Sequence, residues 1–196
     1  MNFLAHALLA GDDPALIVGG VAGDWIKGLL PGALPADLAA GVALHRAIDS
    51  HAESDPGFCR SRQRVSPPRR RYAGVLVDIY YDHLLARDWA THHPQPLPDY
   101  CASVYARIEA RLADLPADAR PVLQRMASED WLGSYADPAG IASVLQRMSR
   151  RLRQPNPLAG GEAELLADLP GFAGDFRIWL AASREAATLW RARRPK

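Results

Sequence analysis

Apolar residues recur along this chain every three or four positions, which is the spacing of amphipathic helices. No stretch alternates with the two-residue period of a half-buried strand, and β-branched residues are sparse. The spacing predicts helices over residues 2–10, 14–27, 37–54, 75–89, 100–115, 121–133 and 138–153, and in a final region around 172–190. We therefore expect an all-α fold, a single-domain helical bundle that comprises residues 1–196.

Proline and glycine mark the expected connections between these helices, at residues 11–14, 28–36, 91–99 and 154–161. The helix predicted over residues 14–27 contains three glycines, Gly19, Gly20 and Gly23, just before Asp24. Glycine lets another backbone approach closely, so Asp24 is expected at a tight contact between helices. The basic tail at 191–196 is expected to be solvated and disordered.

Composition and charge narrow the class of protein. With 196 residues, 48% of them hydrophobic, the chain can bury one sizeable core. A net charge of +1 excludes a protein that binds polyanions over its whole surface, although local basic patches remain possible. The chain has two cysteines, Cys59 and Cys101, which are too few for a disulfide framework and lack the spacing of a metal site. Such sparse use of cysteine suits a protein of a reducing compartment. The first residues lack the basic start of a signal peptide, and no uncharged apolar run approaches the ~18 residues of a transmembrane helix. We expect a soluble, cytoplasmic protein.

Two pairs of polar residues stand four positions apart on strongly apolar predicted helices. His45 and Asp49 form the first pair, and Asp78 and Asp82 form the second. This spacing places both members of a pair on one helix face. A buried carboxylate costs several kcal/mol unless it is paired, hydrogen-bonded or bound to a metal. Together with Asp24, the two pairs favour a metal site, although a single helical histidine is more often a hydrogen-bonded core residue.

A site of imidazoles and carboxylates favours manganese, magnesium or iron(II) over a metal that prefers thiolates. Such an ion, with an open coordination position, can lower the pKa of bound water and hold a phosphoryl oxygen. Hydrolysis of a phosphoester then becomes feasible near neutral pH. Lys27 and Arg46 could supply positive charge to the phosphate.

The most basic part of the chain is the segment 60–71, which has no acidic residue and is interrupted by two prolines. Its arginines are Arg60, Arg62, Arg64, Arg69, Arg70 and Arg71. A solvated surface is the default interpretation of such a run. Nucleic acid is not expected as a partner, because interleaved aromatic residues that could stack on bases are absent.

Four motifs, in this order and spacing, resemble the acyl carrier protein phosphodiesterase family, also called ACP hydrolases. They are MNFLAH at 1–6, GDWIKG at 23–28, GVALHRAID at 41–49 and VDIYYDHLLARDW at 77–89, with a weaker match in SEDWLGSY at 128–135. The family is a divergent branch of the metal-dependent phosphohydrolases with histidine–aspartate (HD) motifs. The resemblance implies the all-helical HD-domain phosphohydrolase fold. It also implies manganese-assisted hydrolysis of the phosphodiester that joins 4′-phosphopantetheine to a serine of holo acyl carrier protein.

The resemblance also implies roles for individual residues. The candidate metal ligands are His6, Asp24, His45, Asp49, Asp78 and Asp82. Lys27, Arg46 and His83 would contact the phosphate or assist proton transfer. Acyl carrier proteins are small and acidic, so the arginines of segment 60–71 are expected to form part of a docking surface. No membrane partner is expected, and the oligomeric state is left open.

Two other functions remain open from the sequence. The same metal chemistry could act on a nucleotide or another small phosphoester, although no nucleotide-specific glycine loop is visible. Alternatively, the chain could be a non-catalytic helical module that binds carrier protein and uses its polar cluster only for structural hydrogen bonds.

Overall fold

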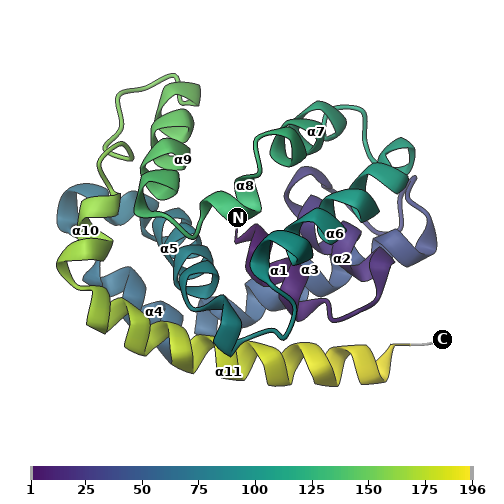
Figure 1. Ribbon diagram of the computed structural model, residues 1–196, viewed down its shortest axis with the longest axis horizontal. Coiled ribbons are helices and arrows are strands. Elements are labelled where there is room, and N and C mark those ends of the chain that lie inside the picture. Colours follow the sequence, from purple (N-terminus) through teal and green to yellow (C-terminus); the bar gives the residue numbers. More distant parts are fainter. Residues whose placement is uncertain (1, 195–196) are drawn as a thin grey trace.

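The computed structural model describes residues 2–194, and all of the regular structure in this range is helical (Figure 1). Eleven α-helices and four short 3₁₀ helices follow one another, and no strand occurs in the range. The prediction of an all-α fold is confirmed. No helix in the described part of the chain combines the length and the apolar character that crossing a membrane requires.

The first three α-helices build the region around the predicted polar cluster. They are α1 (Phe3–Leu9), α2 (Pro14–Ala22) and α3 (Ala36–Ser54), with the 3₁₀ helix η1 (Gly23–Trp25) after α2. Asp13 begins α2, because its carboxylate accepts hydrogen bonds from the N–H groups of Ala15 (2.9 Å) and Leu16 (3.2 Å). Helices α2 and α3 cross at Gly19 and Gly41, where a Cβ on Gly19 would lie 2.8 Å from the Cα of Gly41. The predicted close approach at the glycine-rich segment is confirmed.

The middle of the chain supplies the central helix. It contains α4 (Pro56–Arg64), η2 (Pro67–Tyr72), α5 (Ala73–Arg87) and η3 (Trp89–Thr91). Helix α5 is buried along most of its length, and it packs against α1, α4, α9 and α11. It therefore brings Asp78 and Asp82 into the interior beside the N-terminal helices.

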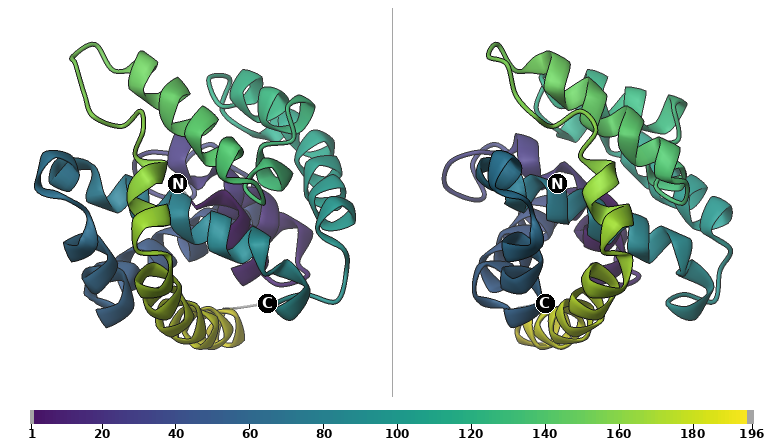
Figure 2. Two further views of the ribbon diagram at one scale, coloured as in Figure 1. Left: turned by 60° about the vertical axis from the view of Figure 1, so that its left-hand side comes forward. Right: turned by 90° about the vertical axis from the view of Figure 1, so that its left-hand side faces the viewer.

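The remaining helices enclose this core. They are α6 (Leu97–Ala110), η4 (Leu112–Asp114), α7 (Arg120–Ser128), α8 (Trp131–Ser134), α9 (Pro138–Arg151), α10 (Glu162–Ala167) and α11 (Leu169–Arg193). The long helix α11 lies along one side of the molecule, opposite α7 and α9 (Figures 1 and 2). It packs against both α3 and α4 and so joins the N-terminal region to the middle of the chain.

Three expectations about local structure are wrong. The region 121–133 forms two helices instead of one, because Asp130 takes a left-handed conformation (φ 44°) and caps α8 through the N–H of Gly133. The helix expected over residues 14–27 ends at Ala22 and continues as the 3₁₀ helix η1 only to Trp25. The tail is not disordered up to residue 194, because Arg191 donates to the carbonyl of Leu9 and lies in α11. Residues 195 and 196 lie outside the described residues.

Candidate metal centre

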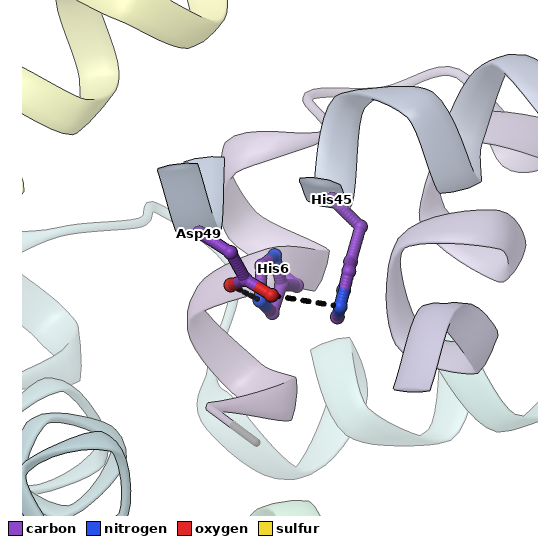
Figure 3. Close-up of side chains that lie close together, drawn as sticks. All are labelled: His6, His45 and Asp49. Carbon is purple, nitrogen blue, oxygen red and sulfur yellow. Dashed lines mark ion pairs between the residues drawn. The ribbon is translucent and has the colours of Figure 1, made fainter. Parts of the chain in front are cut away.

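Two histidines and one aspartate from α1 and α3 meet at a single point (Figure 3). The Nε2 atom of His6 lies 3.1 Å from Oδ1 of Asp49, and Nε2 of His45 lies 3.2 Å from Oδ2 of the same carboxylate. One ligand atom from each residue falls within 4.8 Å of the others. Both histidines are buried, whereas the side chain of Asp49 is 50% exposed. The cluster thus combines two buried imidazoles with a carboxylate that reaches solvent.

Helix α2 sets the orientation of His45. The ring Nδ1 lies 2.8 Å from the carbonyl oxygen of Gly20. A carbonyl only accepts hydrogen bonds, so Nδ1 carries the proton and Nε2 of the neutral ring has its lone pair directed at the cluster. Gly23 leaves room for the ring, since a Cβ there would lie 2.4 Å from Cγ of His45.

Helix α1 places His6 beside His45. The two rings stack with centroids 3.9 Å apart and planes 26° apart. Burial, reinforced by the neighbouring His45, lowers the pKa of His6 from 6.5 to about 4, although Asp49 acts in the opposite direction. His6 is therefore neutral at physiological pH. Neither of its ring nitrogens has a well-directed hydrogen bond within residues 2–194, despite the short distance to Asp49.

This arrangement fits a divalent metal ion. Burial alone would raise the pKa of Asp49, but the imidazoles of His45 and His6, 3.2 and 3.1 Å from its oxygens, outweigh burial and hold this pKa well below its usual value. The cluster therefore presents an anionic carboxylate beside two imidazoles, a set of donors that binds divalent ions when the imidazoles are neutral. The buried Nε2 of His6, without a good hydrogen bond, is the kind of orphaned atom that coordination would satisfy.

Two further carboxylates stand beside the cluster. Oδ1 of Asp24 lies 3.8 Å from Nε2 of His45. Asp24, Asp49 and Asp78 line one cavity of about 350 Å³, together with Glu53 and Gly74. Burial raises the pKa of Asp78, and the charges of Asp49 and Asp24 act in the same direction. A cation at this point would relieve the mutual repulsion of these carboxylates.

Asp82 and His83 lie outside the cluster. Both carboxylate oxygens of Asp82 are engaged at the start of α1, where they accept hydrogen bonds from the N–H groups of Leu4 (3.0 Å) and Ala5 (2.9 Å). Burial raises the pKa of Asp82 from 3.8 to about 7, and these two hydrogen bonds oppose the shift. His83 is buried, with Nδ1 2.7 Å from the carbonyl oxygen of Tyr135. Both contacts hold elements of the backbone in place.

The two predicted phosphate contacts differ in their surroundings. Arg46 donates hydrogen bonds to the carbonyl oxygens of Ile26 (3.0 Å) and Gly28 (2.9 Å), so its guanidinium holds the loop after η1. Lys27 lies between these two residues, is exposed, and makes no ion pair within the described part of the chain.

Most of the predicted docking arginines are bound within the molecule. Arg60 and Arg64 both donate to the buried carboxylate of Asp175 on α11, each at 2.7 Å. The ion pairs of Arg62 and Arg69 are with Glu53 and Glu164, and Arg70 donates to the carbonyls of Gln63 and Val65. Arg71 is exposed, and no ion pair holds it within residues 2–194. Three of the six arginines, Arg60, Arg64 and Arg69, therefore fasten α4 and η2 to the C-terminal helices.

Sequence reasoning missed the carbonyl of Gly20 and the ion pair of Arg111 with Asp37 (2.8 Å). The glycine-rich pattern of α2 was a signal for the first, because close packing exposes a backbone carbonyl to its neighbour. No local signal exists for the second, whose partners are 74 residues apart.

Comparison with known proteins agrees with the family indicated by the motifs. The model of the family described as acyl carrier protein phosphodiesterase matches residues 1–182. Proteins named acyl carrier protein phosphodiesterase are similar to the chain: that of Pectobacterium atrosepticum is 34% identical over 161 residues, 82% of this chain and 83% of the relative. The protein of the same name from Photorhabdus laumondii is 33% identical over 161 residues, 82% of this chain and 81% of its own. That of Escherichia coli O6:H1 is 32% identical over 152 residues, which cover 77% and 79% of the two chains. No solved structure matches the chain significantly. The match over nearly the whole length shows that this chain belongs to the acyl carrier protein phosphodiesterase family.

Proposed function

We propose that this protein is a metal-dependent phosphodiesterase that hydrolyses 4′-phosphopantetheine from the serine of holo acyl carrier protein and leaves the apo form. The observation that carries the proposal is the cluster of His6, His45 and Asp49 beside a carboxylate-lined cavity in a member of this family. The reaction needs an electrophilic site for a phosphoryl oxygen and an activated water. Family membership supplies the substrate in this proposal, and the cluster supplies the chemistry.

His6, His45 and Asp49 would hold the ion, with Asp24 and Asp78 as neighbouring carboxylates. A divalent ion held there, most simply manganese, with magnesium or iron(II) as substitutes, would polarise a phosphoryl oxygen and lower the pKa of bound water. Nδ1 of His45 keeps its proton on the carbonyl of Gly20, which preserves the tautomer that coordination requires. Asp82 fixes α1 and thereby the position of His6.

The cations around the site take two roles in this proposal. Lys27, exposed on the loop after η1, would contact the phosphate or the carrier protein. Arg46 acts as a positioning residue, because its guanidinium fixes the backbone on both sides of Lys27. His83 supports the backbone at Tyr135 and would act on the reaction only through that support. We also propose a cytoplasmic location, where Cys59 and Cys101, which form no disulfide, would remain reduced.

The test is the mass of holo acyl carrier protein after incubation with the protein and manganese. Loss of the phosphopantetheine mass is expected, and it should vanish with chelator and in Asp78→Ala. An unchanged mass under manganese, magnesium and iron(II) would overturn the proposal. Hydrolysis of a small phosphoester without attack on the carrier protein would favour the nucleotide-type substrate instead.

Metal binding can be measured separately from catalysis. Manganese should raise the thermal unfolding temperature, because a ligand at 100 times its Kd stabilises the folded state by about 2.7 kcal/mol. Asp49→Ala should lose this increase. His51→Ala provides the matched control, since His51 lies on the same helix outside the cluster. An equal increase in both variants would place the ion elsewhere.

A further inference from the structure

A second cavity, of about 670 Å³, lies next to the metal centre and has no role so far. One wall is the loop 26–35, which follows η1. The other wall is the segment 113–120, which follows α6 and reaches the first residue of α7. The volume is within the range of small-molecule sites in proteins, roughly 300–1,000 Å³.

Arginine side chains hold both walls in place. Arg46 fixes the loop through the carbonyls of Ile26 and Gly28, as described above. Arg120 fixes the opposite wall by donating to the carbonyls of Leu115 (2.9 Å) and Ala113 (2.8 Å). Loops without regular structure become a defined site when their backbone groups are held in this way.

A third arginine ties the two walls to each other. Arg111, at the end of α6, donates two hydrogen bonds to the carboxylate of Asp37 in the first turn of α3, at 2.8 and 3.2 Å. This contact holds the pKa of Asp37 below its usual value, mainly through the hydrogen bond from Arg111. The two-pronged contact sets the distance between the walls.

The lining combines two kinds of surface. Leu34, Leu115 and Pro116 are apolar, whereas Lys27 and Arg120 are basic. Asp114, the one acidic group among the described residues of the lining, accepts a hydrogen bond from Arg111 at 2.6 Å. Arg120 is already hydrogen-bonded to its own wall, so Lys27 is the basic group that can move toward a bound molecule. A ligand with apolar and hydrogen-bonding parts and an anionic end suits such a lining.

The cavity adjoins the metal centre through η1. Asp24 lies 3.8 Å from His45, and the next residue, Trp25, lines the cavity. Trp25 also stacks on Phe3 of α1, with ring centroids 5.5 Å apart, three residues before His6. The short helix η1 therefore links the surroundings of the cluster, at Asp24, to the wall of the cavity, at Trp25.

We propose that this cavity receives the pantetheine arm of the substrate while the phosphodiester lies at the cluster; the inference rests on the proposed function. The arm is a flexible chain with two amides, a hydroxyl and a geminal dimethyl group. Extended, it spans about 15 Å, as roughly four extended residues do. Along α3, the ten steps from Pro35, which lines the cavity, to His45 also rise about 15 Å, so an extended arm has the length needed to reach from the cluster to the far end of the cavity.

The test measures binding without carrier protein. Isothermal titration of the manganese-loaded protein compares free 4′-phosphopantetheine with inorganic phosphate, which has no arm. We expect the wild type to bind 4′-phosphopantetheine at least tenfold more tightly than phosphate. Ala33→Trp and Ala117→Trp, which introduce bulk from the two opposite walls, should remove that difference. The matched control is Ala102→Trp, at an exposed alanine of α6 that does not line the cavity, and it should keep the difference.

Each outcome has a distinct meaning. Equal affinity of the wild type for the two ligands, or an advantage of 4′-phosphopantetheine that survives in both cavity variants, would overturn the inference. If the binding pattern holds but holo acyl carrier protein keeps its mass, the cavity assignment stands and the proposed hydrolysis fails. Circular dichroism of each variant shows whether it is folded. Because the cavity is blocked from two different walls, the test still holds if one of the two variants does not fold.

Discussion

At the scale of single residues, Asp82 connects two helices that are far apart in the sequence. Its carboxylate accepts hydrogen bonds from the N–H groups of Leu4 and Ala5, 78 and 77 residues away, and so caps the start of α1. Asn2, which occupies the cap position itself, makes no such hydrogen bond through its side chain. The geometry of His6 on α1 therefore depends on a residue of α5.

We predict that Asp82→Ala destabilises the protein by about 2–4 kcal/mol, because two buried N–H groups lose their acceptor. Urea unfolding measures the change. Asp82→Asn should fall between wild type and alanine, since its amide has one acceptor oxygen instead of two. Asp88→Ala, at an exposed carboxylate just after the same helix, is the control and should change stability by less than about 1 kcal/mol. A loss no larger in Asp82→Ala than in this control would contradict the capping role.

We predict that the stability of the protein depends on pH through the buried His83. Burial lowers the pKa of His83 below 6.5, so the folded state binds fewer protons than the unfolded chain when the pH falls below that value. Stability therefore decreases with acidification in this window. In His83→Asn, an amide can still donate to the carbonyl of Tyr135, but this proton-linked loss should be absent.

The measurement is the unfolding free energy of both proteins at pH 7.5 and pH 5. The wild type should lose more stability than His83→Asn between the two pH values. Parallel losses would show that His83 does not contribute. Retention of phosphodiesterase activity in the variant would further separate this supporting role from proton transfer.

At the scale of helices, the crossing of α2 and α3 determines where the candidate metal ligands meet. At Gly19, a Cβ would lie 2.4 Å from the carbonyl oxygen of Leu38, which is too close for any side chain. The backbone contact there brings the carbonyl of Gly20 within reach of His45. A wider crossing would withdraw the acceptor that orients this ring.

We predict opposite effects for the same substitution at two helical glycines. Gly19→Ala should destabilise the protein by about 2 kcal/mol or more, because the new methyl group meets backbone atoms that cannot move aside. It should also weaken manganese binding. Gly74→Ala, in α5, meets no heavy atom within 4 Å and should stabilise the protein by about 0.5–1 kcal/mol. Thermal unfolding of the metal-free proteins tests both, and a loss in each variant would contradict the packing argument.

Local signals predicted the helices well where capping and spacing agreed. The helix predicted from residue 14 does begin at Pro14, and the four-residue spacing correctly placed His45 and Asp49 on one face. Helix α4 was not predicted, because the arginines and prolines of the segment 60–71 indicated a surface run instead. Arg60 and Arg64 of this helix are held by Asp175, 115 and 111 residues away, a contact that no local pattern contains. The role of Asp82 was hidden for the same reason.

At the scale of the whole molecule, α11 fastens the basic segment to the rest of the chain. Its buried Asp175 accepts hydrogen bonds from Arg60 and Arg64, so two of the predicted docking arginines are committed to the fold. A buried carboxylate that loses such partners would be left uncompensated. Charge available to an acidic partner is accordingly found at residues that have no internal ion pair, such as Arg71.

We predict that Arg71→Glu raises KM for holo acyl carrier protein about threefold or more at low ionic strength, and that the effect decreases in ~0.5 M salt because screening weakens charge attraction. Arg153→Glu, an exposed arginine after α9, is the matched control for the change in net charge. Steady-state kinetics at two salt concentrations test this. Equal effects of the two substitutions would remove Arg71 from the docking surface.

The contact between Gly23 and His45 also changes what an alignment of relatives can reveal. A methyl group at Gly23 would lie 2.4 Å from the imidazole Cγ and displace the ring from the cluster. Selection that keeps the histidine must therefore also keep the glycine, although glycine has no group that could bind or react. Invariance of this glycine would therefore reflect the space that the ring of His45 needs. A catalytic site inferred from invariance alone would include such a glycine, although the glycine contributes only by leaving this space free.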